Sequence, residues 1–155
     1  MNFRLTPLSA ETDIERLADE LAPAFAGEAD VARDLLAANL DLLCRDPRPD
    51  PWGCYLARDG EAAVGVCAFK SAPDDQGVVE IAYMTFPALE RRGHAGRMVS
   101  TLTGIAFAAG APMAIAHTSP EENASTSALR RNGFAFAGEV MDPEDGRVWR
   151  WERKA

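Results

Sequence analysis

The sequence predicts one α/β (α+β) domain built on a mixed sheet, and three observations support this. The chain has 155 residues, 47% of them hydrophobic, enough for one compact core and too few for two ordinary domains. Two helix-like segments come first, followed by a run of strand-like segments. A strand, a helix and a hairpin come later, in an order that favours a mixed sheet flanked by helices. We expect residues 1–155 to form a single domain.

The N-terminal segments predict a short strand and two helices. Residues 2–8 are a candidate first strand, and Thr12-x-x-Glu15 has the spacing of a capping box that opens a helix. Residues 30–44 predict a second helix, with an apolar stripe of Val31, Leu35, Leu36, Leu40 and Leu43. Residues 46–51, DPRPDP, form a loop because closely spaced prolines interrupt a helix.

The middle of the chain changes to strand periodicity. Residues 52–58 and 62–70 predict two strands joined at Asp59-Gly60, a strong hairpin signal. Residues 78–86, VVEIAYMTF, are the strongest strand in the chain because they are rich in β-branched and aromatic side chains. This strand stops at Pro87.

The C-terminal part predicts a helix over residues 94–109 and a strand over 112–117. A short helix over residues 124–131 ends at an Asn-Gly stop. A hairpin of residues 134–141 and 147–153 completes the chain. In its last strand alternation places Trp149 and Trp151 on one face, while Arg150, Glu152 and Lys154 face solvent.

Composition excludes several classes of function. Sixteen basic and twenty-four acidic residues give a net charge of −8, whereas a general nucleic-acid binder needs a basic face. No apolar run approaches the roughly 20 residues of a membrane span, and the first eight residues do not resemble a secretory signal. The cysteines, Cys44, Cys54 and Cys67, make no disulfide framework or zinc motif. We expect a cytoplasmic protein without a metal.

The segment that carries chemistry is EIAYMTFPALERRGHAG, residues 80–96. It runs from a strand through a glycine-containing loop into the start of a helix, whose unpaired N–H groups and partial positive charge suit a pyrophosphate. Arg91, Arg92, His94 and Arg97 add local positive charge, and Gly93 lets the backbone approach a ligand closely. An ordinary strand-to-helix turn with solvated arginines is the alternative for the loop taken alone.

The loop resembles the acetyl-CoA-binding motif of the GNAT N-acetyltransferase superfamily, [Q/R]-x-x-G-x-[G/A], which here is residues 90–95, ERRGHA. Glu90 departs from the usual Gln or Arg. Residues 117–140 resemble the second CoA motif, and the chain is most similar to the ribosomal-protein alanine acetyltransferase (RimJ/RimL-like) branch. The resemblance implies a mostly antiparallel mixed sheet whose fourth and fifth strands splay apart around CoA. It also implies an amine acceptor, and dimers are common in the superfamily, so a homodimer is compatible with it.

The resemblance also implies roles for single residues. Glu80 is the candidate general base, with a strand glutamate paired to an arginine as the alternative. The Met84 N–H is the candidate donor to the acetyl oxygen, and Ser125 is the candidate acid for the thiolate. The cofactor-binding candidates are Tyr83, Met84, Thr85, Arg91, Arg92, Gly93, His94, Ala95, Gly96 and Asn123. Ordinary helix capping is the alternative for Asn123 and Ser125.

Many relatives carry a tyrosine four residues before the glycine of the closing Gly-Phe, where this chain has Leu129. The function predicted is direct transfer of an acetyl group from acetyl-CoA to an amine, in a small molecule or at a peptide N-terminus, within a ternary complex. The alternative is a regulatory module that binds CoA or an acyl-CoA without catalysis.

Overall fold

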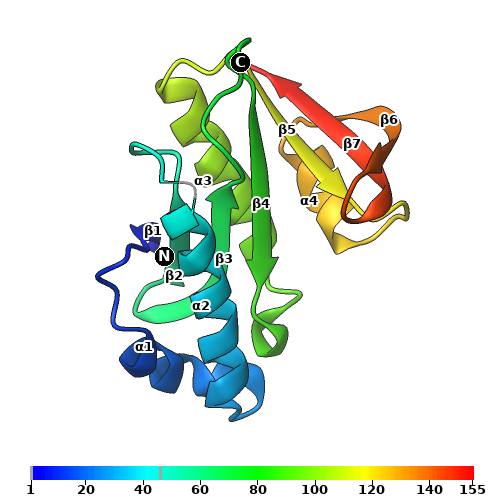
Figure 1. The fold of residues 1–155 in the computed structure, drawn as a ribbon. Helices are drawn as coiled ribbons and strands as arrows, with labels where there is room; N and C mark the ends of the chain where they lie inside the picture. Colours follow the sequence, from blue (N-terminus) through cyan, green and yellow to red (C-terminus); the bar gives the residue numbers. More distant parts are fainter. Residues whose placement is uncertain (1, 46) are drawn as a thin grey trace.

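A computed structural model describes residues 2–45 and 47–155, with the side chains of 42–45 excepted. The predicted positions of Leu43 and Cys44 lie outside the described side chains. The chain forms a single α/β domain (Figure 1). Its elements are β1 (Phe3–Pro7), α1 (Ile14–Leu21), the 3-10 helix η1 (Ala22–Phe25), α2 (Ala29–Arg45), β2 (Cys54–Asp59), β3 (Ala62–Phe69), β4 (Val79–Thr85), the 3-10 helix η2 (Pro87–Leu89), α3 (His94–Ala108), β5 (Met113–Thr118), α4 (Ala124–Arg131), β6 (Ala135–Asp142) and β7 (Gly146–Lys154).

The predicted capping box of the first helix is wrong by one residue. Asp13, not Thr12, is the N-cap of α1, and its carboxylate accepts the Arg16 N–H at 3.1 Å. The Thr12 hydroxyl instead accepts the Ser9 N–H at 2.9 Å, so it closes the preceding turn. The predicted stripe of α2 is also partly wrong, because Val31 is 46% exposed.

The seven strands form one mixed sheet in the order β1-β2-β3-β4-β5-β7-β6. Every neighbouring pair is antiparallel except β4 and β5, which run parallel. These two strands are paired only where Val79 meets Ala114 and Glu80 meets Ile115, and they diverge beyond that point (Figure 1). The expected splay of the fourth and fifth strands is confirmed.

The core lies on both faces of the sheet, as the alternation of strand side chains requires. Cys67 and Phe69 of β3 pack with α3, whereas Val66 packs on the opposite face with α1 and α2. Paired residues share a face, so Glu80, opposite Ile115, is on the Val66 side. Glu80 is partly exposed there, with a fifth of its side chain open to solvent.

The C-terminal hairpin confirms the predicted placement of Trp151, which is fully buried. Trp149 is partly buried and lies on the same face, with its ring 6.4 Å from that of Trp151. Arg150 and Glu152 are partly buried instead of fully solvated, and they form an ion pair at 2.8 Å. Within the described residues, no helix has the length and hydropathy to span a membrane.

Candidate acetyl-transfer site

The opening between β4 and β5 exposes one edge of β4. The Phe86 N–H donates to a β3 carbonyl at 2.9 Å, and the Glu80 carbonyl accepts the N–H of the residue that follows β3 at 2.8 Å. In an antiparallel ladder alternate residues bond to the same neighbour. Met84 shares this parity, so the register directs its N–H toward β3. The N–H groups of Tyr83 and Thr85 are directed toward the opening.

A cavity of about 470 Å³, called the loop cavity below, extends from this edge to the glycine loop. The first turn of α3 forms one wall, and its first intrahelical bond runs from the Arg97 N–H to Gly93. The N–H groups of His94, Ala95 and Gly96 therefore have no partner within the helix. The loop cavity is lined by Tyr83, Met84, Thr85, Glu90, Arg91, Gly93, His94, Ala95, Gly96, Asn123, Ala124, Ser125 and Arg131. Three free amides in one helical turn make an anion-binding surface.

The backbone of the loop requires glycine at one position. Gly93 is the N-cap of α3 and has φ of +80°, in the left-handed region that disfavours side chains. A Cβ atom placed there would meet nothing within 4 Å, so conformation and not space explains this glycine. Arg91 also has a positive φ, of +65°, which costs backbone energy in a residue with a side chain. Strain of this kind is typical of ligand-binding loops.

The arginines of the loop do not act as one group. Arg91 lines the loop cavity, whereas Arg92 is not among its lining residues. The guanidinium of Arg97 contacts the Asp59 carboxylate at 3.3 Å, and Arg97 does not line the loop cavity. Arg131, the last residue of α4, also lines the cavity. It was not among the predicted cofactor-binding residues, although it lies within the second motif.

His94 is the buried titratable group of the loop cavity. Its side chain is 6% exposed, and its Nδ1 atom has no hydrogen-bond partner in the structure. Burial lowers the pKa of His94, because desolvation disfavours the imidazolium. A phosphate bound at this turn would have the opposite effect.

A second cavity of about 420 Å³, the carboxylate cavity, lies beside β4 and β5. It contains Glu80, whose Oε2 atom is 2.9 Å from His117 Nδ1 and 3.4 Å from Lys70 Nζ. Glu80 thus pairs with a histidine and a lysine, not with an arginine. No local sequence pattern indicates this pair, because Glu80 and His117 are 37 residues apart. Asp142 and Arg147 of the terminal hairpin line the far side.

The two cavities share Tyr83 and Ser125. The Tyr83 hydroxyl lies 2.8 Å from Ser125 Oγ and 3.3 Å from the Ser125 carbonyl oxygen. Burial raises the pKa of Tyr83, which keeps its phenol protonated at neutral pH. A substrate group that reached from one cavity into the other would therefore pass these two hydroxyls.

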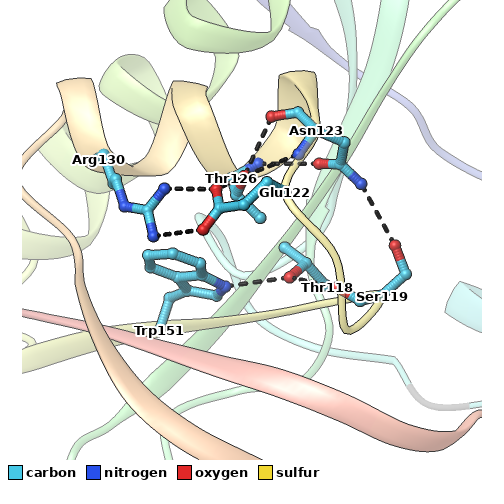
Figure 2. A network of polar contacts seen from close by, with 7 residues as sticks. All are labelled: Thr118, Ser119, Glu122, Asn123, Thr126, Arg130 and Trp151. Atoms are coloured by element: carbon cyan, nitrogen blue, oxygen red, sulfur yellow. Dashed lines mark hydrogen bonds and ion pairs between the residues drawn. The ribbon is translucent and has the colours of Figure 1, made fainter.

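Asn123 has the capping role that the sequence left as its alternative. Its side-chain oxygen accepts the Thr126 N–H at 3.1 Å, and the Thr126 hydroxyl accepts the Asn123 N–H at 3.0 Å. The Asn123 amide also donates to the Ser119 hydroxyl at 3.3 Å (Figure 2). This capping box fixes the first turn of α4, which contains Ser125.

A polar network holds that turn against β7 (Figure 2). Glu122 accepts two hydrogen bonds from Arg130, at 2.5 and 2.7 Å, and these bonds lower the pKa of the Glu122 carboxyl. The Arg130 guanidinium lies 4.9 Å from the ring of Trp151, whose indole N–H donates to the Thr118 hydroxyl at 3.0 Å. The network ties α4 to the end of β5, so Ser125 is held on a fixed support.

Comparison with known proteins identifies the family. A protein-family model described as the acetyltransferase (GNAT) domain matches residues 2–135. A comparison with curated protein sequences finds no significant match.

Solved structures show the same fold at low identity. A RimL ribosomal L7/L12 alpha-N-protein acetyltransferase in complex with CoA is 16% identical, with a TM-score of 0.73 and coverage of 99% of this chain and 94% of that one. A putative ribosomal-protein-serine acetyltransferase from Vibrio cholerae is 12% identical, with a TM-score of 0.78 and coverage of 100% and 95%. AAC(6')-Ib in complex with ribostamycin and CoA is 17% identical, with a TM-score of 0.74 and coverage of 99% and 94%. The family model spans most of the chain, and the chain belongs to the GNAT acetyltransferase family.

Proposed function

We propose that this acetyltransferase moves the acetyl group of acetyl-CoA onto a primary amine, with the thioester at the junction of the two cavities. The observation that carries the proposal is that the loop cavity and the carboxylate cavity meet at Tyr83 and Ser125. One cavity offers free helix amides for phosphates, and the other offers a carboxylate–imidazole pair for an amine. Two of the fold neighbours are described in complex with CoA, and one of these also holds ribostamycin.

The cofactor is assigned to the loop cavity by its donors. The amides of His94, Ala95 and Gly96 would bind the pyrophosphate, and Arg91 and Arg131 would add positive charge. The pantetheine arm would follow the open edge of β4 toward Tyr83. Among the described residues, no group of three or more His, Cys, Asp or Glu side chains is arranged to hold a metal ion.

The backbone of β4 supplies the group that stabilises the acetyl oxygen. Because the Met84 N–H is directed toward β3, we assign this role to one of the two N–H groups that face the opening, that of Tyr83 or that of Thr85. A fixed donor aimed at the developing negative charge lowers the barrier without reorganisation. Met84 then contributes to the wall of the loop cavity.

Glu80 acts on the proton of the amine together with His117. Glu80 Oε2 receives the His117 Nδ1 hydrogen bond, which leaves the Nε2 atom as the acceptor for the amine proton. The carboxylate orients the ring and stabilises the imidazolium that forms. The attack of the amine on the carbonyl follows within the ternary complex.

The first test is isothermal titration of acetyl-CoA into the protein, followed by an acceptor screen that detects released thiol. The screen should contain peptides with free N-termini and polyamines, since the net charge of −8 favours cationic acceptors by steering. Binding of acetyl-CoA with thiol release for at least one amine supports the proposal. Binding without release for any amine would favour a regulatory CoA-binding module. A homodimer and a cytoplasmic location stay predictions from the sequence.

A further inference from the structure

We propose that Tyr83 is a positioning residue for the leaving group, holding the Ser125 hydroxyl so that its proton points at the departing sulfur. The inference rests on the proposed function, since it concerns the same thioester. It assigns a role to a side chain for which the sequence predicted only a backbone contact.

The direction of the hydrogen bond follows from the geometry and chemistry of the two hydroxyls. The Tyr83 hydroxyl has one proton and two neighbouring acceptors, the Ser125 Oγ atom at 2.8 Å and the Ser125 carbonyl oxygen at 3.3 Å. The shorter distance is the usual one for O–H···O, and the longer one lies beyond its range. A phenol is also a stronger acid than an aliphatic alcohol, so Tyr83 donates and Ser125 accepts.

This direction decides what the Ser125 proton can do. If Ser125 donated to Tyr83, its proton would be committed inside the protein. Because Ser125 accepts instead, its own proton is free to point into the cavities that it lines. A hydroxyl that accepts one hydrogen bond is polarised and becomes a better donor in the next.

The position of Ser125 is fixed from both sides. The capping box of Asn123 and Thr126 sets the backbone of the first turn of α4, and the Tyr83 phenol sets the side chain. Tyr83 comes from β4, the strand whose N–H groups face the opening. One residue therefore links the strand that supports the acetyl oxygen with the helix that supports the sulfur.

The proton balance of the step is complete with these groups. The amine nitrogen bonds to the carbonyl carbon, the C–S bond breaks, and its electron pair remains on sulfur. Sulfur takes the Ser125 proton, Ser125 takes the Tyr83 proton, and Tyr83 regains a proton from water in the carboxylate cavity, which it also lines. The amine loses one proton to the His117–Glu80 pair, which passes it to the same water. Amine and thioester thus become amide and thiol with no net gain or loss of protons.

The test compares Tyr83→Phe, Ser125→Ala and the double variant with the wild type. Each single change should lower kcat about 10-fold or more, because general acid catalysis typically contributes about 10²- to 10⁴-fold. The kcat of the double variant should be about equal to that of the less active single variant, because both changes break the same relay. The dissociation constant of acetyl-CoA, measured by titration, should stay within about twofold, since the phosphates bind elsewhere.

Tyr55→Phe is the matched control. Tyr55 is the only other tyrosine, and its hydroxyl donates to the Pro51 carbonyl, outside both cavities. The Tyr55→Phe variant also loses one hydroxyl that bonds to a backbone carbonyl. It therefore measures how much the loss of such a hydroxyl affects folding alone. Its kcat should equal that of the wild type.

Three results would overturn the inference. A Tyr83→Phe variant with wild-type kcat, or single variants whose effects multiply in the double variant, would exclude the relay while leaving the proposed function intact. A wild type that binds acetyl-CoA but releases no thiol with any amine would overturn the proposed function and the relay together.

Discussion

The two cavities that meet at Tyr83 and Ser125 are built in different ways. The loop cavity lies between the edge of β4, the glycine loop and the first turns of α3 and α4, and it contains helix amides without a partner within the helix. The carboxylate cavity is formed by charged side chains from β4, β5 and the terminal hairpin, with Lys70 beside them. In the proposed function, backbone amides bind the phosphates of acetyl-CoA, and the side chains of the other cavity bind the acceptor. The proposal therefore separates cofactor recognition from acceptor recognition within one small domain.

Replacement of the Glu80 carboxylate should have the largest effect on kcat. It should change only the carboxylate cavity. Glu80→Gln keeps the shape of the side chain but removes the charge that orients His117 and stabilises its protonated form. We expect kcat to fall about 10²-fold or more, as for loss of a general base. Thiol release measures kcat, and titration should give an unchanged acetyl-CoA affinity.

Lys70→Gln provides the matched control for this change. It removes the other contact of Glu80, at 3.4 Å, on a side chain that is about half exposed. Its effect on kcat should be much smaller, since an exposed ion pair contributes about 1 kcal/mol or less. Equal losses in the two variants would contradict a special role for the His117–Glu80 pair.

The two cavities also differ in how far the sequence predicts them. Gly93, His94 and Ala95 lie within one contiguous motif, so their shared placement could be predicted without knowledge of the fold. The pairing of Glu80 with His117 depends on the register of β4 with β5, two strands that touch only at one end. No local pattern encodes that register.

The orientation of side chains was likewise not predictable from spacing. Arg97 directly follows the segment that contains Gly93, yet its side chain contacts Asp59 on β2, a strand that the loop sequence does not specify. Leu129, where many relatives carry a tyrosine, is fully buried, while the tyrosine hydroxyl of this chain reaches Ser125 from β4. A chemical group can thus come from an element that the sequence motif does not include.

Two glycine replacements, one at the N-cap of α3 and one in its interior, test whether the loop cavity depends on backbone conformation. Gly93→Ala forces a side chain into a backbone with φ of +80° and should cost about 1 kcal/mol of unfolding free energy. It should also weaken acetyl-CoA binding, because relief of the strain moves the free amides. Denaturant unfolding and titration measure the two effects.

Gly104→Ala is the control for this pair. Gly104 is exposed within α3, and a Cβ atom there would meet nothing within 4 Å. The replacement should raise the unfolding free energy by up to about 1 kcal/mol, because alanine is the better helix former. Opposite signs for the same substitution within one helix would support the conformational argument, and two losses would contradict it.

Removal of a negative charge from the loop cavity should strengthen the binding of a polyanion there. Glu90 lines the cavity and is exposed, so Glu90→Gln should lower the dissociation constant of acetyl-CoA about two- to fivefold at low salt. The gain should shrink as salt rises. Glu11→Gln makes the same charge change outside both cavities and should leave the affinity unchanged. A lower affinity in Glu90→Gln would show that the carboxylate itself contributes to binding.

The smallest effect concerns pH and the buried imidazole of the loop cavity. Burial holds the pKa of His94 below its ordinary value of 6.5 in the folded chain. Between the lowered pKa of the folded chain and 6.5, the unfolded chain binds a proton that the folded chain does not. Stability therefore falls as the pH is lowered through this range. His94→Gln should therefore show a smaller loss of Tm between pH 7 and pH 5.

Acetyl-CoA should change this behaviour in the wild type alone. Phosphates bound near the unpaired Nδ1 atom would favour the imidazolium and raise the pKa of His94, so the ligand should be bound with proton uptake near pH 6. Titrations in buffers of different ionisation enthalpy measure that uptake, which His94→Gln should abolish. Uptake that persists in the variant would place the protonated group elsewhere. His94 would then be a packing residue of the helix start, and the loop cavity would bind its anion through backbone amides and arginines alone.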